Sequence, residues 1–130
     1  MNPQDQYQVV FTVTDTVYQG FVQLFSDKNC LHTDKRYAQS KGFADVVMHG
    51  NILNGFLSHF IGECLPIKNV IIHSQEINYK KPVYQNDQLT FYAVVTEVIA
   101  SVSVVMFNFY FENQHKIKVA KGKIQIGVLN

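Results

Sequence analysis

The segment GNILNGFLSHFIGEC, residues 50–64, has the apolar pattern of a deeply buried helix. Its apolar side chains recur in pairs every three to four positions, so they cover a broad face of a helix with about 3.6 residues per turn. The pairs are Ile52 and Leu53, Phe56 and Leu57, and Phe60 and Ile61, followed by Cys64. A stripe this broad predicts that other structure packs around most of the helix. Pro66, which cannot continue a helix, lies just beyond its end.

The chain after this helix is rich in β-branched and aromatic residues, a composition typical of strands. The predicted strands are Val70–Lys80, Leu89–Ile99, Val102–Glu112 and Lys116–Val128. Because they follow one another through short connections, the sheet is expected to be mainly antiparallel. One long buried helix against such a sheet is an α+β, two-layer arrangement, with the helix in the concave face of a curved sheet.

Two details of the predicted sheet concern its irregular positions. Asn113-Gln114-His115 is expected to form a hairpin turn, and Asn86-Asp87 another turn. The apolar alternation of the last strand changes phase around Gly122, which predicts a β-bulge at that glycine.

The chain before the buried helix is expected to contain one strand, two helices and a loop. Tyr7–Val13 predicts the strand, and Thr14 is a suitable cap for a helix that ends near Ser26. Residues 27–33 (DKNCLHT) have no clear period and are interpreted as a loop. Thr33 is expected to cap a short second helix that runs through about Gln39 and is closed by Gly42.

Composition narrows the class of protein. The 130 residues suit one domain, 1–130, and 47% of them are hydrophobic, enough for a core. The formal net charge is +1 without any block of like charges, so neither nucleic acid nor an anionic membrane surface is an expected partner. Met1–Gln8 is polar and does not resemble a signal peptide, and no apolar run approaches the ~20 residues of a membrane-spanning helix. Cys30 and Cys64 stand alone, which suits a reducing cytoplasm.

Polar groups suited to chemistry lie in the predicted loop and at the start of the buried helix. The loop holds Asp27, Asn29 and His32, and the helix begins with His49-Gly50 and carries Ser58 further along. The sequence has no phosphate-binding glycine loop, no nucleophile elbow and no His/Cys metal set. The expected chemistry is therefore that of a carboxylate and an imidazole, without a metal or another cofactor.

An Asp/His pair on one loop can orient a water molecule, take its proton and return one. A glycine at a helix N-terminus offers a backbone N–H that is supported by the helix dipole and can stabilise charge on a substrate oxygen. Each residue also has an ordinary structural alternative. Asp27 could be a turn residue, His32 a core histidine, and Asn29 a loop residue bonded to its own backbone. Spacing alone does not identify the reaction.

Three segments resemble the motifs of the MaoC-like, R-specific enoyl-thioester hydratase family, in the order and at the spacing of that family. Phe25–Ala38 (FSDKNCLHTDKRYA) resembles its Asp-x-Asn-Pro-Leu-His signature. Val47–Ser58 (VMHGNILNGFLS) resembles its His-Gly-Met-Leu helix start, which ends in a serine. Ile77–Thr90 (INYKKPVYQNDQLT) resembles its aromatic-x-x-Pro-Val-Tyr-x-Gly-Asp-x-Leu-Thr strand and turn.

The resemblance implies a hot-dog fold, in which a curved antiparallel sheet wraps round one long helix. It also implies reversible syn hydration of a trans-2-enoyl thioester to the (3R)-3-hydroxyacyl thioester, with CoA or an acyl carrier protein as the carrier, and a homodimer. Carried over position by position, the catalytic pair falls on Asp27 and His32, supported by Asn29, and the backbone N–H that holds the thioester oxygen falls on Gly50.

Two further residues of the implied site have structural alternatives. His49 is grouped with Gly50 on the substrate side, and its alternative role is to set the start of the long helix. The active-site serine of the family falls on Ser58, which as a helix serine could instead bond the carbonyl one turn earlier.

The chain departs from the motifs without losing a catalytic group. Cys30 replaces the motif proline, Phe25-Ser26 replaces a small residue and a glycine, Asn51 stands where the family often has Met, and Asn86 replaces the turn glycine. The changes at Cys30 and Asn51 affect the expected acyl preference and pocket shape.

Two other functions stay open. A thioesterase on the same fold would direct water to the carbonyl carbon, and a non-catalytic hot-dog module would only bind the acyl thioester or dimerise. The intact Asp27 and His32 favour the hydratase.

Overall fold

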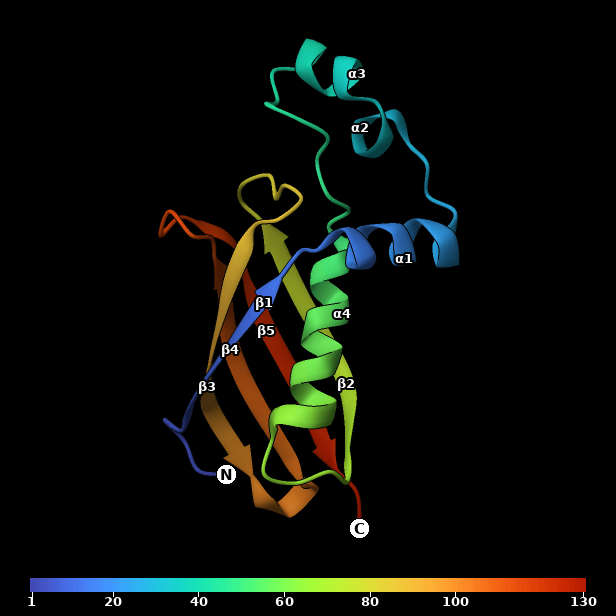
Figure 1. Cartoon of the computed structure of the whole chain (residues 1–130). Coiled ribbons are helices and arrows are strands. Elements are labelled where there is room, and N and C mark those ends of the chain that lie inside the picture. Colours follow the sequence, from blue (N-terminus) through green and yellow to red (C-terminus); the bar gives the residue numbers. More distant parts are fainter.

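Five antiparallel strands form one sheet in the computed structural model, which describes residues 1–130 (Figure 1). The strands are β1 (Gln6–Thr12), β2 (Val70–Tyr79), β3 (Gln88–Ile99), β4 (Val104–Glu112) and β5 (Lys118–Val128). Their order across the sheet is β1-β3-β4-β5-β2, so β1 and β2 are the two edges. The predicted strands and their antiparallel pairing are confirmed, except that residues 100–102 form a 3-10 turn before β4 begins.

The buried helix lies against one face of this sheet, as the apolar pattern predicts (Figure 1). Helix α4 (Asn51–His59) continues into a wider π-helical turn, η1 (Phe60–Cys64). Phe60 is fully buried, and its ring centroid lies 4.7 Å from that of Phe91 in β3. The helix and the inner face of the sheet thus share one cluster of buried side chains, and the α+β arrangement is confirmed.

Three helices precede α4. Helix α1 (Asp15–Phe25) begins where the Thr14 side chain accepts a hydrogen bond from Val17 N, as predicted, and it ends at Ser26, which has a φ of 57°. Two short helices, α2 (Cys30–Thr33) and α3 (Lys35–Ser40), extend beyond the end of the sheet (Figure 1).

The prediction for this region is wrong in two respects. Part of the expected loop 27–33 is helix α2, because the Asn29 side chain accepts a hydrogen bond from Leu31 N and so starts a helical turn. The next helix is capped by Asp34, whose carboxylate accepts from Tyr37 N, and not by Thr33. Thr33 donates its hydroxyl proton back to main-chain carbonyls of the preceding turn instead.

The phase change in the last strand is real, but the bulge lies at Val119 and not at Gly122. The pairing of β4 with β5 passes from Phe111↔Ala120 to Glu112↔Lys118, which leaves Val119 as the extra residue. Gly122 is required for a different reason, because a Cβ there would lie 1.8 Å from the carbonyl oxygen of Glu76. A glycine in a strand can mark a close backbone approach as well as a bulge.

The outer edge of the sheet along β2 has no neighbouring strand, and Ile71 is half exposed on it. None of the helices combines the length and the hydropathy needed to cross a membrane.

Candidate active site

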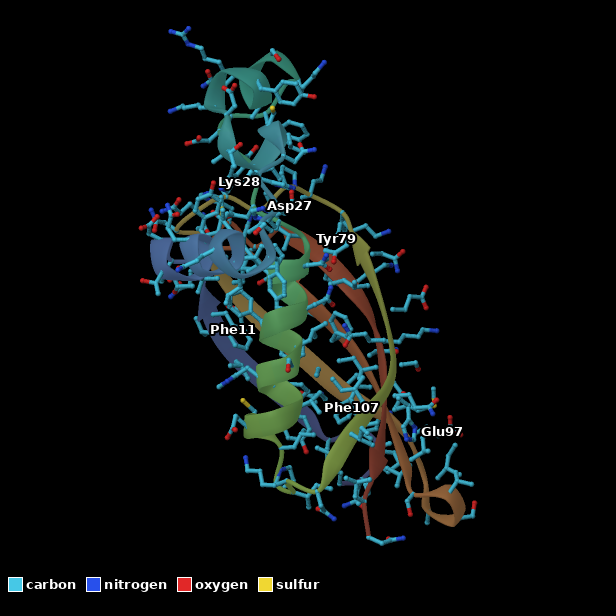
Figure 2. All side chains as sticks on the ribbon, turned by 90° about the vertical axis from the view of Figure 1, so that its right-hand side faces the viewer. Phe11, Asp27, Lys28, Tyr79, Glu97 and Phe107 are labelled. Carbon is cyan, nitrogen blue, oxygen red and sulfur yellow. The ribbon has the colours of Figure 1, made fainter.

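Asp27, His32 and His49 meet where the helices that precede α4 join the body of the fold. Asp27 directly follows the last turn of α1, His32 lies in α2, and His49 lies just before α4. One carboxylate oxygen of Asp27 and one ring nitrogen of each histidine all lie within 4.8 Å of one another. Figure 2 shows Asp27 near the beginning of α4, with Tyr79 at the nearby end of β2.

His32 is held by hydrogen bonds on its ring and on its main chain. Its Nδ1 lies 2.6 Å from the carbonyl oxygen of Val47, so we place the proton on Nδ1, where it donates to that carbonyl. The Tyr18 hydroxyl donates to the carbonyl oxygen of His32 at 2.7 Å, and Val47 N donates to Leu31 O at 3.0 Å. These bonds leave the lone pair of Nε2 free to exchange a proton with a bound water or substrate.

The Asp27 carboxylate faces solvent and is fixed mainly through the main chain. Its side chain is 48% exposed, and Oδ1 accepts a hydrogen bond from Asn29 N at 3.2 Å. The side chain of Asn29 in turn accepts from Leu31 N and starts α2. Asn29 is therefore placed where it shapes the loop between Asp27 and His32, while its side-chain amide contacts neither of their side chains.

His49 is turned into the protein. The residue is 3% exposed, and its Nε2 lies 2.8 Å from the main-chain oxygen of Asp27. Its ring stacks on that of His32 with centroids 4.0 Å apart. His49 also lines the strand-side hollow together with Gly50, so its expected place on the substrate side stays a prediction.

Gly50 carries a free N–H group at the start of α4. Neither a main-chain nor a side-chain acceptor bonds it, as expected for the orphan donors of a first helical turn. Its φ of −58° suits any residue, so conformation does not require a glycine here. Space does, because a Cβ would lie 2.9 Å from the Tyr79 ring.

Tyr79, at the end of β2, lies beside Gly50. Its hydroxyl accepts a hydrogen bond from Asn54 Nδ2 at 3.3 Å, and Asn54 also donates to Asn51 Oδ1 at 2.8 Å. Burial raises the pKa of the Tyr79 hydroxyl above its ordinary value, and the bond with Asn54 offsets part of that shift. The phenol therefore stays protonated at neutral pH.

Two hollows adjoin at the site. The helix hollow, about 840 Å³, lies between α1 and α4 and has a largely apolar lining that includes Phe21 and Phe56. The strand hollow, about 550 Å³, is lined by His32, Gly50 and the segment 79–83. Asp27 and Asn51 line both, so they stand at the junction of the two spaces.

Ser58 is not brought to this group. It is exposed on α4 and lines neither hollow, whereas Gly55 faces the helix hollow. A role for Ser58 at the site stays a prediction.

The three clustered side chains could in principle hold a metal ion, but their geometry does not suit one. A metal lies in the ring plane of each histidine that binds it, whereas the rings of His32 and His49 are stacked with only 28° between their planes. His32 Nδ1 and His49 Nε2 are also occupied by main-chain carbonyls. The arrangement is better suited to a water molecule between a carboxylate and an imidazole.

Sequence reasoning missed several supporting groups. In the sequence, Tyr18 is one more apolar position of an amphipathic helix. The carbonyl of Val47 is a main-chain group, so no residue type in the sequence points to it. Tyr79 lies within a recognised motif, but only the folded chain shows that its ring packs on Gly50.

Comparison with known proteins finds curated relatives named (R)-specific enoyl-CoA hydratase. The (R)-specific enoyl-CoA hydratase of Aeromonas caviae is 34% identical over 77 residues, which cover 59% of this chain and 58% of that protein. The enzyme of the same name from Rhodospirillum rubrum is 30% identical over 96 residues, which cover 74% of this chain and 67% of that protein.

A solved structure and a family model extend the comparison. The (R)-hydratase from A. caviae involved in PHA biosynthesis superposes with a TM-score of 0.90 at 22% sequence identity, over 99% of this chain and 98% of that chain. This likeness confirms the hot-dog fold, here a sheet that is not closed into a barrel. The model of the MaoC like domain matches residues 3–108, and the chain therefore belongs to the MaoC-like domain family.

Proposed function

We propose that this protein catalyses the reversible, (R)-specific hydration of a trans-2-enoyl thioester to the 3-hydroxyacyl thioester. The observation that carries the proposal is the convergence of Asp27, His32 and the free N–H of Gly50 on the strand hollow. Relatives named (R)-specific enoyl-CoA hydratase and 3-hydroxybutyryl-CoA dehydratase support a hydro-lyase reaction.

In the proposed reaction, Asp27 and His32 hold one water between the carboxylate and the free Nε2. The pair takes a proton from the water as its oxygen bonds to C3 of the enoyl group. The electron pair of the double bond moves toward the thioester, where the Gly50 N–H and the α4 dipole stabilise the charge on the carbonyl oxygen. The pair then returns a proton to C2 on the same face, which completes syn addition and restores the enzyme.

The carrier of the acyl group is proposed to be CoA or an acyl carrier protein, both of which attach the thioester through a phosphate-bearing arm. Lys80 and Lys81 line the strand hollow, and neither forms an ion pair with a carboxylate. Relatives named for each carrier exist, including a 3-hydroxyacyl-[acyl-carrier-protein] dehydratase of Solanum lycopersicum. Two unpaired ammonium groups at the hollow suit phosphate from either source.

The test is an assay of the purified protein with crotonyl-CoA. Loss of the enoyl absorbance with formation of (3R)-hydroxybutyryl-CoA is the expected result, and a thiol reagent monitors free CoA in the same reaction. Thiol release with retention of the enoyl group would indicate the thioesterase. Saturable binding of crotonyl-CoA without either product would indicate a binding module.

We also propose that the protein acts as a homodimer. Strand β2 leaves a row of main-chain donors and acceptors unpaired at one edge of the sheet, and such an edge favours pairing with a second copy. Light scattering at micromolar concentration is expected to give about twice the chain mass of 14.9 kDa. A monomer mass at that concentration would refute the dimer.

A further inference from the structure

We propose that His49 is a positioning residue whose buried ring sets both members of the catalytic pair relative to Gly50, an inference that rests on the proposed function of Asp27 and His32. On one side, Nε2 of His49 lies 2.8 Å from the main-chain oxygen of Asp27, so it donates a proton to that carbonyl. On the other, the ring stacks on His32 at a centroid distance of 4.0 Å. One side chain thus contacts both catalytic residues, and its Nε2 also lies 4.0 Å from Asp27 Oδ2.

The ring itself has little freedom to move. His49 is 3% exposed, and the rings of Phe21 and Tyr18 lie at centroid distances of 4.6 and 5.9 Å from it. A buried aromatic ring enclosed by other rings is confined to one rotamer by packing. Any group bonded to this ring is therefore held in a defined place.

Asp27 needs such support because its own segment supplies little. It follows Ser26, which leaves the helical conformation with a φ of 57°, and precedes the turn that starts α2. Its carbonyl oxygen has no hydrogen-bond partner besides His49. The bond from His49 is thus the direct link between the main chain of the catalytic aspartate and the segment that leads into α4.

The position of His49 in the chain adds a second consequence. The next residue is Gly50, whose free N–H is the proposed donor to the thioester oxygen. Two consecutive residues then fix the distance between the water-activating pair and the group that holds the carbonyl. In catalysis this distance has to match that between C3 and the thioester oxygen, and errors of about 1 Å cost up to 10²-fold in rate.

The other ring nitrogen indicates that a histidine is kept here despite a cost. With the proton on Nε2, Nδ1 carries a lone pair that is buried and has no hydrogen-bond partner. A buried acceptor without a partner lowers stability, and an apolar ring would fill the same space without that penalty. Retention of the imidazole therefore points to the bond that Nε2 makes with Asp27.

Three substitutions separate the two contacts. His49→Phe keeps an aromatic ring against His32 and removes the hydrogen bond, His49→Gln keeps an amide donor for the Asp27 carbonyl and removes the stack, and His49→Leu removes both. We expect kcat to fall about 10-fold in each of the first two variants and about 10²-fold in the third, with KM within about twofold of the original. A raised KM with unchanged kcat would show that His49 binds substrate directly and would overturn the proposal.

NMR chemical shifts measure the positions of His32 and Asp27 without any enzymatic turnover. The proton shifts of the His32 ring report the ring current of residue 49, so His49→Phe is expected to preserve their direction and His49→Leu to abolish it. The amide signals of Asp27 and Lys28 are expected to move in Phe and Leu but to stay closer to the original in Gln. Unchanged His32 and Asp27 signals in His49→Leu would overturn the positioning role even if the protein proved not to be a hydratase.

A matched background tests whether His49 acts through the pair. In a protein that already carries His32→Ala, adding His49→Phe is expected to lower the remaining kcat by less than it does in the original protein. Because His49→Phe leaves a ring of similar size in the site, its folding can be verified by circular dichroism before the kinetics are interpreted. Fully additive losses would show that His49 acts independently of His32 and would contradict the proposal.

Discussion

Two regions of the molecule differ in how many buried residues they contain and in which site residues they carry. The body, which is the sheet with α4 and η1, contains most of a cluster of 21 buried hydrophobic residues. The excursion, residues 14–47 with α1, α2 and α3, contains a single buried residue, Ala38. Figure 1 shows the excursion extending from the end of the body where α4 begins, and it is the excursion that carries Asp27 and His32.

The difference shows how the loop that carries Asp27 and His32 is held. Fully buried apolar side chains stabilise the body. The excursion is held at the site by partly buried side chains such as Phe21, which packs against the core, and by directed hydrogen bonds, among them His32 Nδ1 to Val47 O and Tyr18 to His32 O. Substitutions in the body should therefore act on stability, and substitutions at the junction should act on catalysis with little change in stability.

The largest effect is expected from Phe91→Ala in the body. Phe91 is fully buried among the rings of Phe60, Phe109 and Phe111, so its loss leaves a cavity and should lower the free energy of unfolding by about 3–5 kcal/mol. Urea denaturation measures the change, with Val10→Ala, at a half-exposed position of β1, as the control of small effect. A loss below about 1 kcal/mol for Phe91→Ala would contradict the assigned core.

The next effect, Gly50→Val, lies at the junction. We expect a loss of about 3 kcal/mol in transition-state stabilisation, measured as kcat/KM, because the N–H donor and the space beside it are both disturbed. Since a Cβ at Gly50 meets Tyr79, the double variant with Tyr79→Leu shows how much of the loss is crowding. A complex with a substrate analogue in which the thioester oxygen lies more than about 3.5 Å from Gly50 N would exclude the donor role.

Asp27→Asn tests the excursion itself. Loss of the carboxylate should lower hydration of crotonyl-CoA by about 10²-fold or more, and His32→Ala should do the same. Thermal unfolding should change little in Asp27→Asn, because the carboxylate is half exposed and its amide replacement can still accept from Asn29 N. Near-normal turnover of Asp27→Asn would rule out the proposed mechanism.

The sequence predicts the body well because its signals are periodic. A helical stripe of paired apolar residues and four apolar runs separated by turns leave few alternatives to a helix against an antiparallel sheet. The bulge was displaced from Gly122 to Val119 because phase alone shows that a residue has been inserted and does not show where. The glycine that attracted the assignment is needed for the close approach of Glu76 O instead.

Within the excursion, α1 was predicted correctly, whereas α2 and α3 were predicted less well because local hydrogen bonds, not periodicity, shape them. Asn29 and Asp34 each start a short helix by accepting one main-chain N–H, and either residue would also suit a plain turn. The assignment of Asp27, His32 and Gly50 to one site came from motif resemblance. That His49 faces the catalytic loop, and that Ser58 faces solvent, depends on how α1 and α2 pack, which no local pattern encodes.

A smaller effect is expected at Asn51, which the two hollows share. Gln75 donates to Asn54 Oδ1 and Asn54 to Asn51 Oδ1, so the Asn51 amide is held as a polar group at the junction. Asn51→Met replaces it with the residue that the motif resemblance leads one to expect. We expect kcat/KM for 2-octenoyl-CoA to rise about 10-fold relative to crotonyl-CoA, since each added apolar contact is worth about 1–3 kcal/mol. An unchanged ratio would show that Asn51 does not contact the acyl chain.

Tyr18→Phe is expected to have the smallest effect and tests the bonds that hold the excursion. The hydroxyl donates to His32 O at 2.7 Å, and its removal should lower stability by about 0.5–1.5 kcal/mol and kcat severalfold.

Burial, with a smaller contribution from Asp15, raises the pKa of Tyr18 in the folded protein above its ordinary value. A raised pKa means that the folded state retains this proton longer than the unfolded state, so the stabilisation is complete below about pH 10 and is lost as the pH rises through the folded pKa. Denaturation between pH 8 and 11 should therefore show a smaller decline in stability for Tyr18→Phe than for the original protein. Because Tyr7, Tyr79 and Tyr110 also have raised pKa values, some decline should persist in the variant. Identical pH profiles would show that folding does not raise the pKa of Tyr18.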